Sequence, residues 1–394
     1  MTDSKAKPAT RAKRTVVARR VTEGPAPSRT TAPAAPGNGV TTAPQRQSRI
    51  PTMQDIARAS GVSQSTVSRV LTGAPTVVPI NPATRERVLE VARQMRYRPN
   101  PLARGLRGAR TMLLGVIVRE ITDPFFAGAV DAISSEANRR GYNVVLGHAH
   151  GKTDEAIALR AVLETRHCDA ILLLGDTSDQ PRLLEDLRDT NINVVGLWQG
   201  SVPVPGISTV SVDNRAGVAG LLAHLTDLGH KRIAFVGGGF SEGRLLGDIG
   251  ERRAAFLDLM ADAGLPILDN YICEVENNLR GGAASFEALM NLPVPPTAIL
   301  ASTDLLAIGA IHAAGRMNMM VPRDVSIVGF DDLPMAEYTN PALTSVRQPM
   351  AEMAAVGVRA AIDIAGPGGA PVVQLLAPSV VVRESSGPPP DSAR

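Results

Sequence analysis

A short stretch of polar side chains between residues 63 and 69 has the chemistry of a hydrogen-bonding surface. Its amide, hydroxyl and guanidinium groups are spaced so that one face of a helix would carry several of them. Such groups match the hydrogen-bond donors and acceptors of base edges in the major groove of DNA. The chemistry predicted here is recognition, with no bond made or broken. The side chains concerned are Ser63, Gln64, Ser65, Thr66 and Arg69.

Short helices joined by a tight turn must hold these side chains in place. Thr52 can cap a first helix over residues 53–60, which Gly61 would end. A second helix is predicted over residues 64–71, and a third over residues 82–96. This is the pattern of a helix-turn-helix, whose second helix enters the major groove, although any helical hairpin could show as much.

The net charge of +3 hides an uneven distribution along the chain. Residues 1–110 hold 20 Lys and Arg against 5 Asp and Glu, whereas the remaining 284 residues hold 21 against 33. A basic first quarter indicates a nucleic acid or an anionic membrane surface as its partner. Residues 1–48 show no apolar periodicity, so we expect a disordered basic tail there. That tail fits either a non-specific DNA arm or a passive extension.

From residue 112 onward, unbroken apolar runs alternate with stretches of helical pattern. Such runs indicate parallel strands that are buried on both faces and connected by helices. Two sets of these units fit two α/β lobes better than one very large sheet. The predicted strands are 113–118, 143–147, 170–175, 193–198, 232–237, 271–275, 298–302 and 325–330, with a strand-rich segment at 372–385.

Four segments resemble a known family when they are taken in order. They read MQDIARASGVSQSTVSRVL (53–71), TRERVLEVARQMRYRPNPLARGLRG (84–108), VDNRAGVAGLLAHLTDLGHKRIAFVGG (212–238) and STDLLAIGAIHAAGRMNMMVPRDVSIVGFDD (302–332). The family is the lactose-repressor (LacI/GalR) family of bacterial transcription regulators, and the similarity covers residues 50–387. It implies an N-terminal all-α helix-turn-helix headpiece and an α/β two-lobed, periplasmic-binding-protein-like core.

The resemblance also implies a function and its partners. We expect a transcriptional regulator, acting as a repressor, that binds a palindromic double-stranded DNA operator as a homodimer. A small effector bound between the two lobes would control it allosterically. A palindromic operator needs two headpieces, so the homodimer follows from the mechanism.

The resemblance sets the expected boundaries. A headpiece at residues 49–98 and a hinge helix at 99–110 would lie between disordered tails at 1–48 and 388–394. The effector-binding and dimerisation core would span residues 111–387. In that core the first lobe is expected at about 111–210 and 344–369, and the second lobe at about 211–343 and 370–387.

In this family, residues after the capping serine meet base edges, and a hinge leucine wedges into the central base step. Arg69 is placed to pair bidentately with a guanine, worth about 1–3 kcal/mol of discrimination. Leu106 matches the wedge that kinks the duplex from the minor groove. The alternative is an ordinary linker helix with Leu106 packed on the core. The predicted DNA-binding residues are Thr52, Ser63, Gln64, Ser65, Thr66, Arg69, Asn100, Leu106 and Arg107.

The resemblance also implies an effector site at strand ends of the core. Aromatic residues there would stack on a sugar ring or a nucleobase, although Phe126 also fits plain core packing. Where the family often has an aspartate after the fourth strand, this chain has Leu197. The lack of that polyol-binding carboxylate argues against a plain hexose. The effector classes that stay open are a sugar, a sugar derivative and a nucleoside. The predicted effector-binding residues are Asp123, Phe125, Phe126, Trp198, Arg252, Thr303 and Asp331.

Composition argues against other classes of protein. Cys168 and Cys273 form neither a disulfide framework nor a zinc pattern, and we predict no metal and no cofactor. The first 30 residues lack an apolar signal core, and no apolar run approaches the ~18–20 residues of a membrane span. We therefore expect a cytoplasmic, nucleoid-associated protein with no membrane partner.

Two other functions would fit parts of the sequence. The core alone would allow a periplasmic solute-binding protein, but the attached helix-turn-helix and the missing signal sequence argue against it. An enzyme on a Rossmann-like fold would need a phosphate loop, and the glycines at 237–239 do not form G-x-G-x-x-G. We therefore predict a protein that is not an enzyme.

Overall fold

The computed structural model describes most of the chain between residues 51 and 390, in two separate units. The units are Met1–Tyr97 and Arg98–Arg394. The described ranges are 51–72, 79–97, 110–118, 121–148, 168–175, 193–200, 207–238, 240–241, 244–245, 247–364 and 372–390. The predicted tail at 1–48, residues 99–109 of the hinge predicted at 99–110, and residues 391–394 of the tail predicted at 388–394 lie outside the described residues. The tail prediction was wrong for residues 388–390, which the structure describes, because Pro389 is buried against the second lobe near Gly229.

The first unit contains the three predicted helices, α1 (Met53–Ser60), α2 (Gln64–Thr72) and α3 (Pro82–Gln94). A reciprocal capping box begins α1: the Thr52 hydroxyl accepts from the Asp55 backbone N–H, and the Asp55 carboxylate accepts from the Thr52 backbone N–H. Gly61 ends α1 with φ +66°, in the left-handed region that favours glycine.

A small aliphatic core holds the three helices together. Its buried members come from all three helices, and Ile56, Val67 and Val88 are fully covered. Because these residues recur at helical spacing, each helix turns one apolar face inward and leaves its polar face outside. Burying one such side chain contributes about 1.5–3 kcal/mol, so this cluster fixes how α2 is presented.

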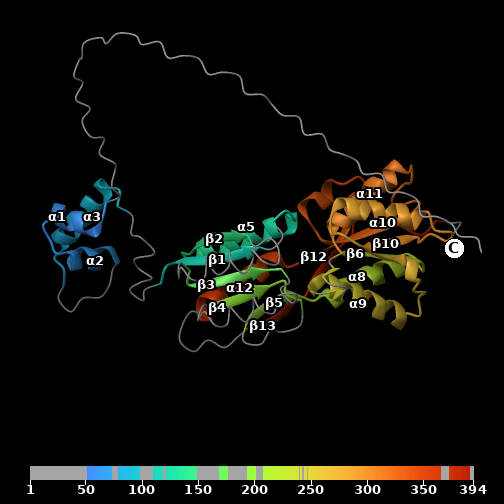
Figure 1. Cartoon of the computed structure of the whole chain (residues 1–394), viewed down its shortest axis with the longest axis horizontal. Coiled ribbons are helices and arrows are strands. Elements are labelled where there is room, and N and C mark those ends of the chain that lie inside the picture. The colour runs from blue at the N-terminus through green and yellow to red at the C-terminus, as the bar shows by residue number, and fades with distance from the viewer. Residues whose placement is uncertain are drawn as a thin grey trace, which may run out of the picture. The chain divides into compact units, whose positions relative to one another are not determined.

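The first lobe of the second unit is built on a six-stranded parallel sheet with the order β13-β5-β4-β3-β1-β2. The strands are β1 (Leu113–Val118), β2 (Asn143–His148), β3 (Ala170–Leu174), β4 (Asn193–Leu197), β5 (Ser208–Val212) and β13 (Val373–Leu376). Helices α5 (Pro124–Arg139) and α12 (Met350–Ile364) pack on each other, and α12 also packs on β3, β4 and β5 (Figure 1).

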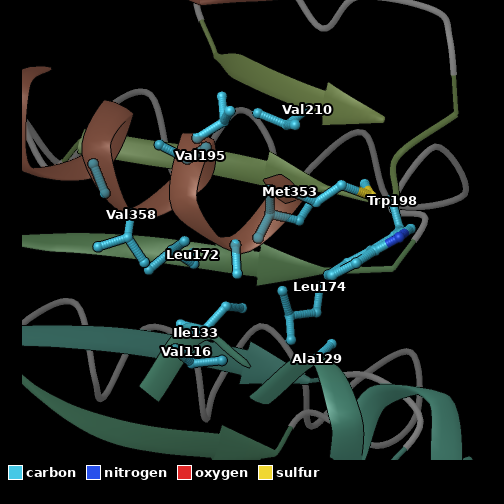
Figure 2. Close-up of a cluster of buried hydrophobic side chains, with 14 of the residues drawn as sticks. Val116, Ala129, Ile133, Leu172, Leu174, Val195, Trp198, Val210, Met353 and Val358 are labelled. Atoms are coloured by element: carbon cyan, nitrogen blue, oxygen red, sulfur yellow. The ribbon is translucent and has the colours of Figure 1, made fainter. Parts of the chain in front are cut away.

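Aliphatic side chains of these strands and helices form the core of the first lobe. Figure 2 shows Val116, Leu172 and Val195 from the strands facing Ile133 of α5 and Val358 of α12. Strands β1, β3 and β4 are apolar along most of their length because a parallel sheet buries both of its faces. This explains why uninterrupted apolar runs predicted most of them.

The second lobe has its own six-stranded sheet with the order β14-β12-β11-β10-β6-β9, parallel except for β14 against β12. The strands are β6 (Ile233–Gly238), β9 (Ile272–Val275), β10 (Ala298–Ala301), β11 (Ser326–Asp331), β12 (Thr344–Arg347) and β14 (Ser379–Val381). The helices are α8 (Asn214–Asp227), α9 (Gly247–Asp262), α10 (Leu279–Met290) and α11 (Asp304–Arg316), with 3-10 turns η1 (Asp269–Tyr271) and η2 (Pro334–Tyr338) and a short hairpin of β7 (Phe240–Ser241) and β8 (Arg244–Leu245).

Alternate side chains along a strand point to opposite faces of the second sheet. Along β6, Ile233 and Phe235 join a core with α8 and α9, whereas Ala234 and Val236 join a core with α10 and α11. This follows from the two-residue period of a strand. The sheet is therefore covered by a helix pair on each face, as the alternation of strands and helices predicts.

The expected lobe boundaries near the C-terminus differ from the observed sheets. Thr344–Arg347 was expected in the first lobe but lies in the second sheet as β12. Val373–Leu376 was expected in the second lobe but forms β13, at the edge of the first sheet beside β5. The sequence pattern of a short strand shows that the segment is extended but not which sheet it joins. The two points at which the chain passes between the lobes were therefore predicted too early in the sequence.

None of the helices that the structure describes is long and apolar enough to span a bilayer.

Candidate DNA-binding and effector sites

Helix α2 presents the polar face that the sequence predicts. Gln64, Ser65 and Arg69 are exposed, and Thr66 is half-buried. The Ser63 hydroxyl accepts from the Thr66 backbone N–H at 3.2 Å, which caps the helix, and it lies 2.8 Å from the hydroxyls of both Ser65 and Thr66. These bonds order polar groups at the helix N-terminus, where free N–H groups and the helix dipole favour an anion such as a phosphate.

The described part of the first unit has an excess of basic side chains. In the described residues of the first unit, six arginines stand against three acidic residues. Besides Arg69, the exposed ones are Arg58, Arg85, Arg87, Arg93 and Arg96. Exposed arginines of a DNA-binding domain supply the sequence-independent part of its affinity through phosphate contacts.

Thr52 has a local structural role in this unit. Its hydroxyl donates to the Asp55 carboxylate at 2.7 Å and belongs to the capping box of α1. A contact of Thr52 with DNA stays a prediction. Asn100, Leu106 and Arg107 lie outside the described residues, and their roles also stay predictions.

In the second unit, predicted effector residues lie at the carboxyl ends of strands from both sheets. Asp331 is the last residue of β11, Trp198 directly follows β4, and Thr303 follows β10 as the N-cap of α11. Asp123 follows β1 and caps α5, accepting from the Phe125 N–H at 2.9 Å. Ligands usually bind at this end of the strands in open α/β sheets.

Arg252 of α9 is the centre of a buried polar network. Its Nε donates to Asn214 Oδ1 at 2.9 Å, and one terminal nitrogen donates to the Ser302 carbonyl at 2.7 Å. The same nitrogen lies 3.4 Å from Asp331 Oδ1. The guanidinium carbon lies 3.6 Å from the centroid of the Phe330 ring, a cation–π contact. The family resemblance assigned Arg252 and Asp331 to one site, and the structure brings them together.

Asp331 is held in an unusual state. Its backbone has φ +123°, a region that residues other than glycine rarely adopt and that costs about 1–3 kcal/mol. Burial raises the pKa of its carboxyl well above the ordinary value, and the positive charge of Arg252 opposes that rise. Strained backbone and a perturbed acid together are typical of a functional site.

Gln348, directly after β12, connects Asp331 to the first lobe. Its Oε1 accepts from the Trp198 indole N–H at 3.0 Å, and its Nε2 donates to Asp331 Oδ1 at 2.8 Å. Because an indole nitrogen can only donate, the orientation of this amide is fixed. Trp198 itself has φ +58°, so both residues bound by Gln348 carry unusual backbone.

Asn277 makes a second connection between the lobes. The Thr303 hydroxyl donates to Asn277 Oδ1 at 2.6 Å, and Asn277 Nδ2 lies 3.4 Å from Asp123 Oδ2. The structure thus joins Asp123 and Thr303, two predicted effector residues from different lobes, through a third side chain.

The aromatic residues are more buried than a stacking role suggests. Phe125 and Trp198 pack edge to face with ring centroids 5.3 Å apart, and both belong to the core of the first lobe. Phe126 packs edge to face on Phe125 and is half-buried. Direct stacking by Phe125 or Trp198 on an effector stays a prediction, because protein atoms already cover both rings.

Sequence reasoning missed three polar residues of this site, Asn214, Asn277 and Gln348. Asn214 joins Arg252 to the carboxylates of Asp248 and Glu251, at 2.7 and 2.8 Å. A search for polar residues just after each predicted strand would have found Asn277, which follows β9. It would have missed Asn214 and Gln348, because β5 and β12 were not predicted.

A second buried carboxyl, Asp304, is expected to make stability depend on pH. It accepts from the Ser345 hydroxyl at 2.6 Å and the Leu333 N–H at 2.7 Å, yet burial raises its pKa to about 7. The unfolded value is about 3.9, so folding favours the proton, and this contribution is lost as pH rises towards 7. The free energy of unfolding of the wild type minus that of Asp304→Asn should therefore fall by about 2–3 kcal/mol between pH 5 and pH 8.

Denaturant titrations at several pH values measure that difference. Asp324→Asn is the contrasting variant, because a hydrogen bond from Arg323 lowers the pKa of Asp324. Asp324 therefore titrates below the range from pH 5 to pH 8. The difference in the free energy of unfolding between the wild type and Asp324→Asn should stay constant over that range. A constant difference for Asp304→Asn as well would contradict the prediction.

Comparisons with known proteins agree with this geometry. Residues 52–100 match the family of bacterial regulatory proteins of the lacI type, and residues 222–386 match the periplasmic binding protein-like domain. The chain is 33% identical over 308 residues to catabolite control protein A of Priestia megaterium, covering 78% of this chain and 90% of that relative. The chain belongs to the LacI family. Its members similar to this chain include HTH-type transcriptional repressors and regulators.

Other LacI-family proteins are similar over comparable lengths. The HTH-type transcriptional repressor CytR of Escherichia coli K12 is 31% identical, covering 78% of this chain and 88% of that relative. The solved complex of the transcriptional regulator CelR with cellobiose shares 28% identity and has a TM-score of 0.63. That match covers 85% of this chain and 99% of the CelR chain. This LacI-family chain therefore has the predicted fold, a helix-turn-helix region and a two-lobed core.

Proposed function

We propose that this LacI-family protein is a sequence-specific transcriptional regulator, acting as a repressor, that binds a palindromic operator as a homodimer. A small sugar-like or nucleoside-like effector between the core lobes controls it. The observation that carries the proposal is the exposed polar face of α2, which a capped helix and a packed core hold rigidly. Rigid presentation matters because base readout depends on hydrogen-bond geometry.

The dimer follows from the proposed mode of binding. One headpiece of this size reads a half-site of a few base pairs, so a specific palindrome needs two related by a twofold axis. The CytR relative is named as a repressor, which supports repression as the mode of action. The hinge roles of Asn100, Leu106 and Arg107 belong to the same proposal.

Chemistry at the strand ends supports a polyol effector. The Asp331 carboxylate can accept from hydroxyl groups, and the Arg252 guanidinium can donate to them. The Ser302 hydroxyl, beside the carbonyl bound by Arg252, is buried with no hydrogen-bond partner among the described residues. The cellobiose complex of CelR supports a sugar. A ribose would present similar hydroxyls, so nucleosides belong to the proposed class.

Control by the effector requires two states with different DNA affinity. The two connections through Gln348 and Asn277 join residues of the effector site across the lobes. An effector that bonds to Asp331 or Thr303 would compete with these connections or add to them. It would thereby shift how the lobes are held, which is the differential interaction that allostery needs.

The test is a binding-site selection with the full-length protein. Purified protein is incubated with a random DNA library, and the recovered sequences should converge on a twofold-symmetric site. A thermal-shift screen of sugars, sugar phosphates, nucleosides and polyols should then identify ligands that alter the affinity for that site. Recovery of unrelated sequences would contradict sequence-specific binding, and an asymmetric half-site alone would contradict the dimer.

A further inference from the structure

A single carboxylate holds the first residues of the core. Asp169 lies just before β3, and its Oδ1 accepts from both the Thr111 N–H and the Thr111 hydroxyl at 2.7 Å. Its Oδ2 accepts from the Met112 N–H at 3.0 Å. The Asp169 N–H donates to the Leu113 carbonyl at 2.8 Å, which places the carboxylate in register with β1. Hydrogen bonds to an ionised acceptor are about twice as strong as neutral ones, so this clamp is firm.

The clamped segment has a backbone that it would not adopt freely. Met112 has φ +61°, in the left-handed region, and this conformation needs surrounding contacts to persist. Its carbonyl accepts from the Asn143 N–H at 3.0 Å. Arg110, one residue before the clamp, donates to the Tyr142 hydroxyl at 3.2 Å. Residues 110–112 are therefore fixed from β2, β3 and the loop before β2.

This position lies where the two functional parts of the chain are joined. The first unit ends at Tyr97, and the described core begins at Arg110. The polypeptide chain connects the first unit to the core covalently. The place and direction in which this chain leaves the core therefore limit the positions that the headpiece can reach. The clamp is at the amino ends of β1 and β3, whereas Asp123 and Trp198 lie beyond the carboxyl ends of β1 and β4. The strands of one rigid sheet therefore connect the clamp to the proposed effector site.

We propose that Asp169 is a positioning residue for DNA binding, which acts by fixing the point and direction in which the chain towards the headpiece leaves the first lobe. The inference rests on the proposed function and adds to it a residue that touches neither DNA nor effector. A loosened clamp would leave both sites intact but would let the two headpieces of a dimer sample more arrangements. Operator affinity falls because ordering those arrangements costs entropy on binding.

Asp169→Asn tests this with a minimal change of shape. An amide has one accepting oxygen and one donating nitrogen. Whichever way it turns, its NH₂ group faces an N–H donor, either that of Thr111 or that of Met112. The expected result is a loss of about tenfold in affinity for the operator fragment selected by the wild type. Affinity for a scrambled fragment of equal length should stay the same.

Glu136→Gln is the matched control. Glu136 is a buried carboxylate of the first lobe, whereas Asp169 is half-buried, and the partners of Glu136 are Arg139 of its own helix and Arg140 at the C-cap of that helix. The Glu136→Gln substitution removes one negative charge, as Asp169→Asn does, but leaves the hydrogen bonds of Asp169 intact. Its operator affinity should therefore stay within twofold of the wild type. Equal losses in the two variants would overturn the proposal. If Asp169→Asn does not fold, Thr111→Val removes one of the three bonds to the carboxylate and should give a smaller loss in the same direction.

A second measurement separates positioning from general destabilisation. Insertion of Gly-Gly after Gly108 loosens the same connection without touching the core. It should reduce operator affinity by a similar factor, and the combined variant should lose no more than either change alone. Additive losses would show that Asp169→Asn acts elsewhere and would overturn the proposal. If the wild type selects no sequence at all, the proposed function fails and this inference falls with it. If the wild type selects an operator but Asp169→Asn binds that operator with unchanged affinity, the inference about Asp169 is overturned and the proposed function stands.

Discussion

Replacing Arg69 with alanine should abolish the DNase footprint on the selected operator at protein concentrations that saturate the wild type. Arg69 is exposed near the end of α2, so its removal leaves no cavity in the headpiece core. A bidentate pair with guanine contributes about 1–3 kcal/mol per half-site, and a dimer loses it twice. We therefore expect a loss of about 100-fold or more in operator affinity, with an unchanged thermal unfolding midpoint.

The control for that result is Arg93→Ala. Arg93 is exposed on α3, pairs with Glu90 at 2.8 Å and carries the same charge in the same unit. Removing it should weaken operator and scrambled DNA alike and by a small factor, because it changes only the electrostatic attraction to phosphates. If Arg69→Ala behaves in the same way as Arg93→Ala, then Arg69 does not read bases.

Replacing Arg252 with methionine should have the largest effect on the core. It removes the charge next to buried Asp331 and the donors to Asn214 and Ser302. Removing one partner of a buried ion pair costs about 3–5 kcal/mol, because the other charge stays buried without compensation. The variant should unfold at lower denaturant concentration, and its thermal shift with the ligand found for the wild type should disappear.

Two further variants make this result specific. Arg215→Met removes an exposed arginine of the same lobe that pairs with Asp258 and Asp262, and it should change stability little. The double variant Arg252→Met with Asp331→Asn removes the isolated carboxylate. It should recover much of the lost stability but none of the ligand response. A double variant as unstable as the single one would show that Asp331 is not the source of the cost.

The sequence predicted the strands that are apolar along their whole length. Both faces of β3 and β10 are buried, so their composition alone identifies them. Strand β5 escaped notice because it reads STVSV, with serines at buried positions. The structure explains how those serines are tolerated: Ser211 donates to the Gly200 carbonyl at 2.6 Å, and Ser208 accepts from the Val372 N–H at 2.9 Å. Such compensation depends on partners that the pattern does not show.

The candidate site was predictable only in part, for a similar reason. The capped helix of the headpiece depends on local spacing, so Ser63 and its neighbours could be placed from sequence. Arg252 and Asp331 came from the resemblance to a family. Gln348 could not be predicted, because its partner Trp198 is 150 residues away and the contact exists only once both lobes are folded. The burial of Trp198 likewise depends on α12, which returns to the first lobe from the other end of the chain.

Trp198 is the only tryptophan among the 394 residues. Its indole N–H donates a hydrogen bond to Gln348, the side chain that connects the two lobes. Indole emission from the whole protein therefore originates at one buried place between Phe125 and Gln348. A change in how the lobes are held would alter the wavelength and quenching of that emission without any attached dye. The protein thus carries its own optical reporter of the state of its core.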